Sequence, residues 1–206
     1  YEIARQIHDK LINTVSYNHP VSDNGGKDLA HTAFGALVRD SSGNPHKPVC
    51  DGYTLAYEYL LQQCGIEAAY IGGVAGSDKL SAGGHAWNIV KLDGQWYEVD
   101  ATWDGSWNDM RDEGDPYINI LLDDYSFHSR LEHYLFLLST PHMTDYDVDS
   151  SYFTYYFSDG SYYWFSPQSV HIRDSASDAF LTETEKAVYS LMDQAPIADY
   201  DYILTW

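Results

Sequence analysis

The chain has 206 residues, of which 44% are hydrophobic and 16% aromatic, and its formal net charge at pH 7 is −20. This composition is typical of a folded protein, and the length allows one domain with a real core plus a smaller additional part. The charge argues against nucleic acid or an anionic membrane surface as a partner, because both need a positive protein surface, and no apolar run is long enough to insert into a membrane.

The first part of the sequence is predicted to be helical. A four-residue spacing of apolar side chains predicts a helix over residues 2–15. Its apolar face consists of Ile3, Ile7, Leu11 and Val15. Further helices are predicted over residues 28–39 and 50–63, separated by a loop rich in turn-forming residues at 41–48. Gly65 follows the third helix and is a natural helix stop.

Strands are predicted to come next. Four segments have a strand-like composition: 67–74, 85–92, 95–103 and 134–139. Asp93-Gly94 lies between the second and the third segment, and an Asp-Gly pair in such a place is a strong β-hairpin signal. Residues 104–130 are predicted to form a long polar loop. Because the helices precede the antiparallel strands, the predicted fold class is α+β.

The composition changes near residue 145, beyond which Asp and Tyr dominate. We therefore predict a core over residues 1–145 and a small appendage over residues 146–206. Within the appendage, Asp159-Gly160 predicts a second hairpin, and a capping box at residues 182–185 predicts a short helix. The aromatic hairpin could bind carbohydrate or peptide, but we favour the alternative that it docks on the core.

Cys50 lies at the predicted start of the third helix. The N–H groups and the macrodipole at a helix N-terminus favour an anion, so they favour the thiolate, which is the nucleophilic form of cysteine. The alternative is a structural role, because free cysteines are usually buried. Cys64 lies at the other end of the helix, about 21 Å away at 1.5 Å per residue. That distance is too long for a disulfide with Cys50, so we interpret Cys64 as structural.

His85 and Asp100 are predicted to lie on the same face of the first hairpin. If Asp93-Gly94 is a two-residue turn, Trp87 pairs with Asp100, and His85 is the diagonal neighbour of Asp100. A carboxylate there can hold the imidazole and stabilise its protonated form. A slip of one residue would place the two side chains on opposite faces. The alternative for Asp100 is a residue at the strand end that bonds to a turn.

These residues supply a nucleophile, a base and a group that orients the base, which is the general arrangement for acyl transfer. Around them stand five spaced motifs: Val49-Cys50-Asp51-Gly52-Tyr53, Cys64-Gly65-Ile66, His85-Ala86-Trp87-Asn88, Gln95-Trp96-Tyr97-Glu98-Val99-Asp100 and Thr102-Trp103-Asp104. Together they resemble the bacterial transglutaminase-like superfamily. Segments 33–38 and 134–137 also resemble that family, and the similarity covers roughly residues 1–145.

The resemblance implies a papain-like α+β core, in which the nucleophile helix packs against an antiparallel sheet. It implies a catalytic triad with Cys50 as nucleophile, His85 as general base and acid, and Asp100 as the residue that orients His85. It also implies an oxyanion site, for which the backbone N–H of Cys50 and the side chain of Tyr17 are candidates. For Tyr17 the alternative is an ordinary core or surface aromatic. Trp87 and Trp103 are candidates for the walls of a substrate groove, with core packing as the alternative.

The predicted function is therefore that of an enzyme that attacks an amide carbonyl of a protein or peptide with Cys50 and forms a thioester. Transfer of the acyl group to water would make it a peptidase or amidase, which we favour. Transfer to a lysine amine would make it a protein cross-linking transglutaminase. The alternative from another class is a non-catalytic binding or scaffolding module at the cell envelope, against which the complete triad argues.

No cofactor and no metal are expected. Asp145, Asp147 and Asp149 resemble the start of an EF-hand loop, but Ser150 and Tyr156 occupy the places where that loop needs Gly and Glu. The spacings typical of zinc ligands do not occur. The resemblance and the acidic, tyrosine-rich composition favour an extracellular or cell-envelope location, where the appendage could contact cell-wall glycan. We expect no signal peptide within the chain.

Overall fold

The computed structural model describes residues 1–22, 29–39, 42–43, 47–76 and 80–105, and the strand segments 138–139, 143–144, 147–148, 153–156 and 162–171. The helices are α1 (Glu2–Thr14), α2 (His19–Ser22), the 3-10 helix η1 (Leu29–His31), α3 (Ala33–Leu37) and α4 (Cys50–Gln63). The strands are β1 (Ala68–Gly76), β2 (Gly83–Leu92), β3 (Gln95–Val99), β4 (Leu138–Ser139), β5 (Met143–Thr144), β6 (Asp147–Val148), β7 (Phe153–Tyr156) and β8 (Tyr162–His171).

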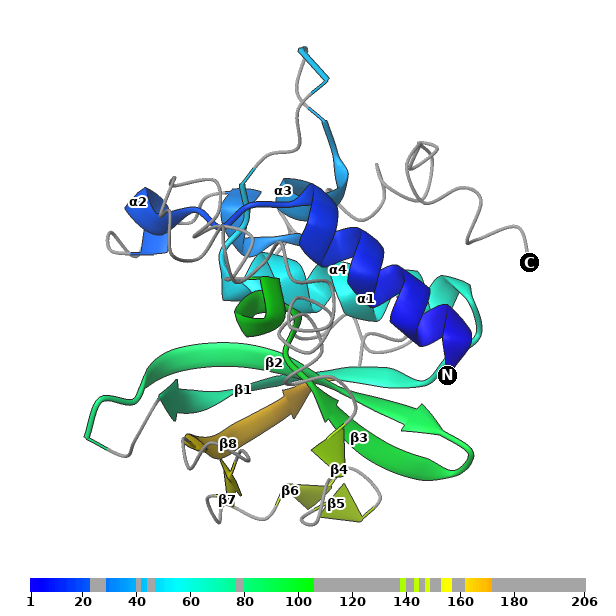
Figure 1. Cartoon of the computed structure of the whole chain (residues 1–206), viewed down its shortest axis with the longest axis vertical. Helices are drawn as coiled ribbons and strands as arrows, with labels where there is room; N and C mark the ends of the chain where they lie inside the picture. Colours follow the sequence, from blue (N-terminus) through cyan, green and yellow to red (C-terminus); the bar gives the residue numbers. More distant parts are fainter. Residues whose placement is uncertain are drawn as a thin grey trace, which may run out of the picture.

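The helices lie on one side of a six-stranded sheet with the strand order β4-β3-β2-β1-β8-β7 (Figure 1). Every pairing in this sheet is antiparallel. Strands β5 and β6 form a separate two-stranded sheet. The predicted α+β class, with the nucleophile helix next to an antiparallel sheet, is confirmed. Within the described residues, no helix has the length and apolar character needed to cross a bilayer.

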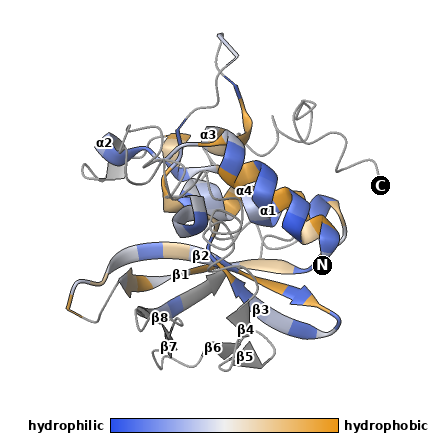
Figure 2. Ribbon diagram, in the orientation of Figure 1, coloured by the Kyte–Doolittle hydropathy of each residue, from blue (hydrophilic) through white to orange (hydrophobic). Residues whose placement is uncertain are grey.

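The core lies between α1, α4 and the sheet. Hydrophobic and hydrophilic residues alternate along α1 (Figure 2), as expected for a helix with one buried face. Two buried tyrosines of α4 tie this helix to α1: the Tyr53 hydroxyl donates to the carbonyl oxygen of Val15 at 2.6 Å, and the Tyr57 hydroxyl donates to that of Ala4 at 3.0 Å. Each buried tyrosine thus combines apolar contact with a satisfied hydroxyl, which fixes the position of α4.

Asn88 fastens α4 to the sheet. Its buried side-chain amide donates to the carbonyl oxygens of Thr54 in α4, at 3.0 Å, and Ala69 in β1, at 3.3 Å. Because both acceptors are main-chain atoms, the contact sets the distance between the first turns of α4 and the centre of β2. The N-terminal half of α4 is thereby held next to strand β2, which carries His85.

The first hairpin has the predicted register. Strand β2 pairs with β3 so that Leu92 faces Gln95, and the turn residues Asp93 and Gly94 have φ angles of 51° and 78°. Positive φ at both central positions is the requirement of a tight two-residue turn, which Asp-Gly satisfies. Because this register is fixed, the end of β3 at Val99 lies beside Asn88 in the middle of β2, and Asp100 follows it toward the half of β2 that carries His85.

The sheet does not end at residue 145, where the sequence analysis placed a boundary. Strand β8 pairs with β1 along its length, and β7 pairs with β8 through the predicted aromatic hairpin. Gly73 makes this contact possible, because a Cβ atom there would lie 2.3 Å from the carbonyl oxygen of Ser166. The register of β1 and β8 shifts between Gly72 and Gly73, opposite Pro167. Strands β7 and β8 therefore extend the sheet that contains β1, β2 and β3.

Two local predictions differ from the structure. Strand β3 ends at Val99, whereas the prediction extended it to residue 103, and residues 101–105 are helical. The helix predicted over 28–39 is divided into η1 and α3. The polar loop from 106 onward, the segment 134–137, Asp145, Asp149 and the helix after residue 182 lie outside the described residues.

Candidate active site

Cys50 is the first residue of α4, and its side chain is half-buried. The residue before it is fixed by a hydrogen bond from the Val49 N–H to the carbonyl oxygen of Ala30, at 3.0 Å. Gly52 lets η1 approach closely, because a Cβ atom there would lie only 2.4 Å from the same oxygen. The local sequence therefore presents the thiol at a helix N-terminus, where unpaired N–H groups favour an anion.

His85 and Asp100 are in direct contact. The distance from Nε2 of His85 to Oδ2 of Asp100 is 2.6 Å, and the two side chains are only 7% and 3% exposed. The other carboxylate oxygen, Oδ1, accepts the backbone N–H of Trp103 at 3.1 Å. Asp100 therefore makes both the contact with His85 that an orienting role needs and the bond to a turn that its alternative needs. Because Nε2 of His85 is occupied, Nδ1 is the ring nitrogen left for the thiol.

The surroundings of His85 favour its protonated form. Burial by itself lowers the pKa of the imidazole, but the charge of Asp100, its hydrogen bond, and the contact with Cys50 outweigh burial and raise the pKa to about 10. An imidazolium beside Cys50 stabilises a thiolate. For Cys64, at the opposite end of α4, burial raises the pKa of the thiol instead. The two cysteines do not form a disulfide with each other, as predicted, and have different environments.

Two tryptophans hold the His85 ring. Trp103 stacks on it, with ring centroids 4.5 Å apart and an angle of 16° between the planes. Trp87 is stacked farther away, at 6.0 Å, and is only 1% exposed. Its indole N–H donates to Glu98 at 2.6 Å. Burial raises the pKa of Glu98 to about 8, although the bond from Trp87 opposes the rise. Trp87 thus packs behind the triad and is not among the described residues that line the cleft.

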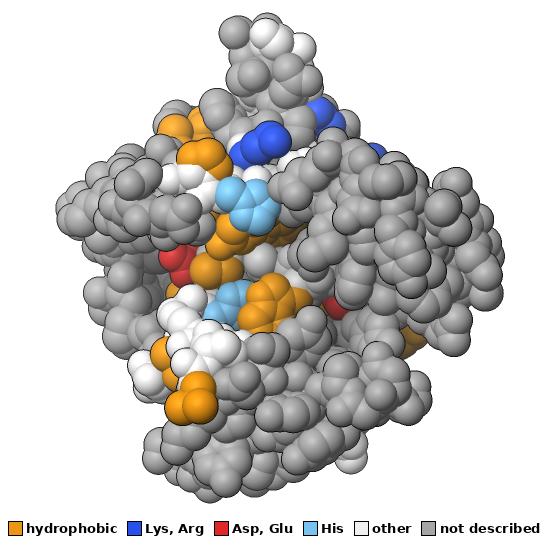
Figure 3. Space-filling model, turned by 60° about the vertical axis from the view of Figure 1, so that its left-hand side comes forward, with side chains coloured by type: hydrophobic (Ala, Val, Ile, Leu, Met, Phe, Trp, Pro, Cys, Tyr) orange, Lys and Arg blue, Asp and Glu red, His pale blue; other side chains and the backbone are white. Residues whose placement is uncertain are grey.

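A cleft of about 470 Å³ opens at Cys50. Its described lining consists of Tyr17, His31, Val49, Cys50, Asp51, Tyr70, Gly72, Gly73, Gly84, His85 and Gln168. The structure thus brings Tyr17, the oxyanion candidate, into the same cleft as Cys50 and His85. Figure 3 shows a hollow on one face, with histidine side chains at its border, and the basic side chains visible in this view lie outside it.

Three further lining residues were not singled out in the sequence: His31, Asp51 and Tyr70. They come from η1, α4 and β1, and they contact one another through side-chain hydrogen bonds. Asp51 follows the nucleophile candidate directly, which was an available signal. His31 and Tyr70 lie far from it in the sequence, so only the fold brings them to the cleft.

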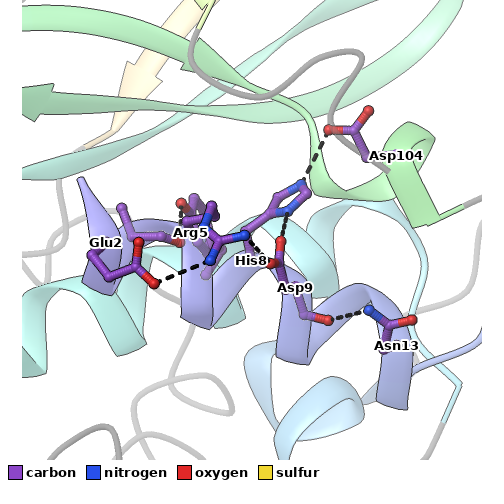
Figure 4. Close-up of polar contacts among 8 residues, drawn as sticks. Glu2, Arg5, His8, Asp9, Asn13 and Asp104 are labelled. Atoms are coloured by element: carbon purple, nitrogen blue, oxygen red, sulfur yellow. Dashed lines mark hydrogen bonds and ion pairs between the residues drawn. The ribbon is translucent and has the colours of Figure 1, made fainter. Parts of the chain in front are cut away.

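A buried His–Asp pair supports the turn after Asp100. Nε2 of His8 lies 3.1 Å from Oδ2 of Asp104, and the two side chains are 0% and 1% exposed (Figure 4). Nδ1 of His8 lies 3.3 Å from Asp9. Burial lowers the pKa of His8, but the bonds to Asp104 and Asp9 outweigh it, so the pKa is raised. The pair links α1 to the helical turn that carries Trp103. Asp104 is part of a motif noted in the sequence, but nothing there indicated His8 as its partner.

Among the described residues, no group of three or more His, Cys, Asp or Glu side chains is arranged to hold a metal ion. The carboxylate of Asp51 instead contacts Nδ1 of His31, and that of Asp100 contacts His85 and the backbone of Trp103. A half-buried thiol at a helix start, facing a histidine held by a carboxylate, defines the class of site: a cysteine–histidine–aspartate arrangement suited to acyl transfer.

Comparison with known proteins agrees with this geometry. Residues 1–101 match the family described as the transglutaminase-like superfamily. This part of the chain, which contains Cys50, His85 and Asp100, therefore belongs to that superfamily. Cysteine-dependent acyl transfer is the general chemistry that the family implies.

Two curated relatives are similar to the chain. They are the kyphoscoliosis peptidases of Mus musculus and Homo sapiens, each 33% identical over 64 residues. The similarity covers 28% of this chain and 10% of each relative. The chain thus corresponds to about a tenth of the length of these relatives.

Proposed function

We propose that this protein hydrolyses amide bonds of proteins or peptides through a thioester formed on Cys50. The observation that carries the proposal is that His85 contacts both the Asp100 carboxylate and Cys50 at the wall of an open cleft. The name of the two relatives, kyphoscoliosis peptidase, also supports hydrolysis.

In the first half-reaction, the proton of the Cys50 thiol passes to Nδ1 of His85, and Sγ attacks the carbonyl carbon of the amide. A C–S bond forms, and the electron pair of the C=O bond moves to oxygen. The backbone N–H of Cys50 and the hydroxyl of Tyr17 are the proposed donors to this oxyanion. The C–N bond then breaks, and the proton on His85 goes to the leaving amine. The product is a thioester between the acyl group and Cys50.

In the second half-reaction, water replaces the amine. His85 accepts a proton from water, the resulting hydroxide adds to the thioester carbon, and the C–S bond breaks. The proton returns to Sγ, so that the free acid leaves and the thiol is restored. Asp100 keeps Nε2–H of His85 bonded throughout, which leaves Nδ1 available in both steps. A primary amine in place of water would give transamidation from the same thioester.

The test uses casein whose lysines are dimethylated, so that they keep their positive charge but are not primary amines, in the presence of the fluorescent amine monodansylcadaverine. Peptide-bond hydrolysis creates new N-terminal amines, side-chain amide hydrolysis releases ammonia without new termini, and transamidation attaches the fluorophore. We expect hydrolysis products to exceed fluorophore incorporation, and the Cys50→Ala variant to give neither. Incorporation that dominates would replace hydrolysis with transamidation. Absence of all three, with a Cys50 that resists alkylation, would favour the binding-module alternative.

A further inference from the structure

A second polar cluster lies in the cleft, beside the triad. Nδ1 of His31 is 2.7 Å from Oδ2 of Asp51, and the hydroxyl of Tyr70 donates to Oδ1 of the same carboxylate at 2.8 Å. All three side chains line the cleft that opens at Cys50. Asp51 follows Cys50 directly, so their Cα atoms are about 3.8 Å apart.

The hydrogen bonds fix how the cluster faces a ligand. A carboxylate only accepts, so the proton in the shorter contact is on Nδ1 of His31, and in the tautomer with its single proton there Nε2 carries a lone pair. This Nε2 atom is buried and has no hydrogen-bond partner among the described residues. Buried polar atoms without partners are rare in folded proteins. The cluster therefore offers an acceptor atom that the described part of the protein leaves unused.

A purely structural role does not account for the cluster. The attachment of η1 to the start of α4 is already made by the hydrogen bond from Val49 to Ala30 and by the close approach at Gly52. The side chains of His31 and Asp51 remain 29% and 33% exposed. Two partly exposed polar groups on a cleft wall are available to a bound molecule in a way that buried structural groups are not.

The charge of the cleft indicates the chemistry of the ligand. Apart from the Cys50–His85 pair, Asp51 carries the only formal charge among the described lining residues, which include no Lys and no Arg. An ammonium group has three N–H donors and no acceptor, so it suits the Asp51 carboxylate and Nε2 of His31 together. A carboxylate of a substrate would instead be repelled at this position.

We infer that His31, Asp51 and Tyr70 form a specificity subsite for a positively charged amino group of the substrate, next to the amide that Cys50 attacks. The inference rests on the proposed function, because it names the substrate class of the same cleft. Asp51 supplies the charge, His31 supplies a second acceptor, and Tyr70 holds the carboxylate in place. Substrates with a lysine side chain or a free amino terminus near the scissile amide fit this site.

The test measures how charge on a small thiol reagent changes its reaction with Cys50. The probes are 2-aminoethyl methanethiosulfonate, which is cationic, and the neutral methyl methanethiosulfonate. In each case the Cys50 thiolate attacks the thiosulfonate sulfur, forms a disulfide and releases methanesulfinate. Peptide mass spectrometry gives the rate at Cys50 for each reagent. The readout is the cationic-to-neutral ratio of these rates.

We expect Asp51→Asn to lower this ratio about tenfold relative to the wild type. Asp93→Asn, which removes the same charge from the exposed hairpin turn, is the matched control and should keep the wild-type ratio. If the wild type and Asp51→Asn have the same ratio, the inference is overturned. It is also overturned if Asp51→Asn and Asp93→Asn lower the ratio equally, because an equal fall would be a long-range effect of net charge.

A second measurement needs no variant. Nα-acetyl-lysine amide and Nα-acetyl-norleucine amide differ by the side-chain amino group, and each is added at millimolar concentration while methyl methanethiosulfonate labels wild-type Cys50. Slower labelling with the lysine compound, by threefold or more, supports the subsite, and equal rates contradict it. A different result would show that the proposed function itself is wrong. Cys50 would then react with the neutral reagent no faster than Cys64, whatever the cationic-to-neutral ratio of rates is.

Discussion

The buried pair of His8 and Asp104 provides a quantitative test of how the site is supported. Replacing His8 with Leu removes the partner of a carboxylate that is 1% exposed. At the separation of 3.1 Å and an effective dielectric constant of about 20, the attraction between unit charges is about 5 kcal/mol. Breaking a buried pair from one side typically costs about 3–5 kcal/mol. We therefore expect His8→Leu to lose a large part of a total stability of about 5–15 kcal/mol.

The loss should depend on pH, with a sign set by the raised pKa of His8. A group whose pKa is higher in the folded state stabilises the fold fully below its unfolded pKa, about 6.5 for His. That contribution disappears as pH rises through the folded value. The difference in unfolding free energy between wild type and His8→Leu should therefore be largest near pH 5.5 and smaller at pH 9.5.

Urea unfolding at the two pH values measures this difference. The double variant His8→Leu with Asp104→Leu is the control, because removing both charges should recover much of the loss. A difference that grows with pH, or a double variant no more stable than the single one, would refute the ion-pair account. Weakening the pair should also slow alkylation of Cys50, because the turn that Asp104 anchors carries Trp103.

Two other changes have definite expected results. Asp100 accepts N–H groups from both His85 and Trp103, whereas an Asn side chain has only one acceptor oxygen. We expect the Asn oxygen in Asp100→Asn to keep the bond from Trp103, so that the Asn amide N–H faces Nε2 of His85. The imidazole proton would then lie on Nδ1, the atom that must accept the thiol proton. Turnover should fall about 10²–10⁴-fold, and a variant with near wild-type turnover would contradict the orienting role. Because the raised pKa of Glu98 means that the folded state disfavours its charge, the wild type should lose stability as pH rises from about 4.5 to about 8. Glu98→Gln can still accept the hydrogen bond from Trp87, so it should raise the melting temperature at pH 7.5 and leave it unchanged at pH 4.5. An equal change in melting temperature at the two pH values would argue against a neutral Glu98.

The parts of the fold that depend on short-range signals could be predicted from the sequence. Cys50 was expected at a helix start and His85 diagonally across the hairpin from Asp100, because Asp93-Gly94 fixes the hairpin register through two positive φ angles. The helix that begins at Cys50 also ends where the following Gly65 predicted. In each case a few neighbouring residues determine the geometry.

Other features depend on contacts between distant segments. The end of β3 at Val99 could not be predicted, because the break follows from Asp100 accepting the N–H of Trp103, whereas the alternation of residues continues. The pairing of β8 with β1 requires Gly73 to approach Ser166, and sequence periodicity does not identify partners so far apart. The meeting of η1, α4 and β1 at the cleft has the same origin, since each segment alone gives no indication of the other two.

The central claim is that His85 and Asp100 activate Cys50. It is tested most directly by the rate of iodoacetamide alkylation of each cysteine near pH 6, measured by peptide mass spectrometry. A thiol with an ordinary pKa of about 8.5 is only about 0.3% ionised there, and Cys64, whose pKa is raised by burial, is the internal control. We predict that Cys50 reacts at least tenfold faster than Cys64 and that His85→Ala removes the difference. If folded Cys50 is as inert as Cys64, while both react equally after unfolding, the account is contradicted.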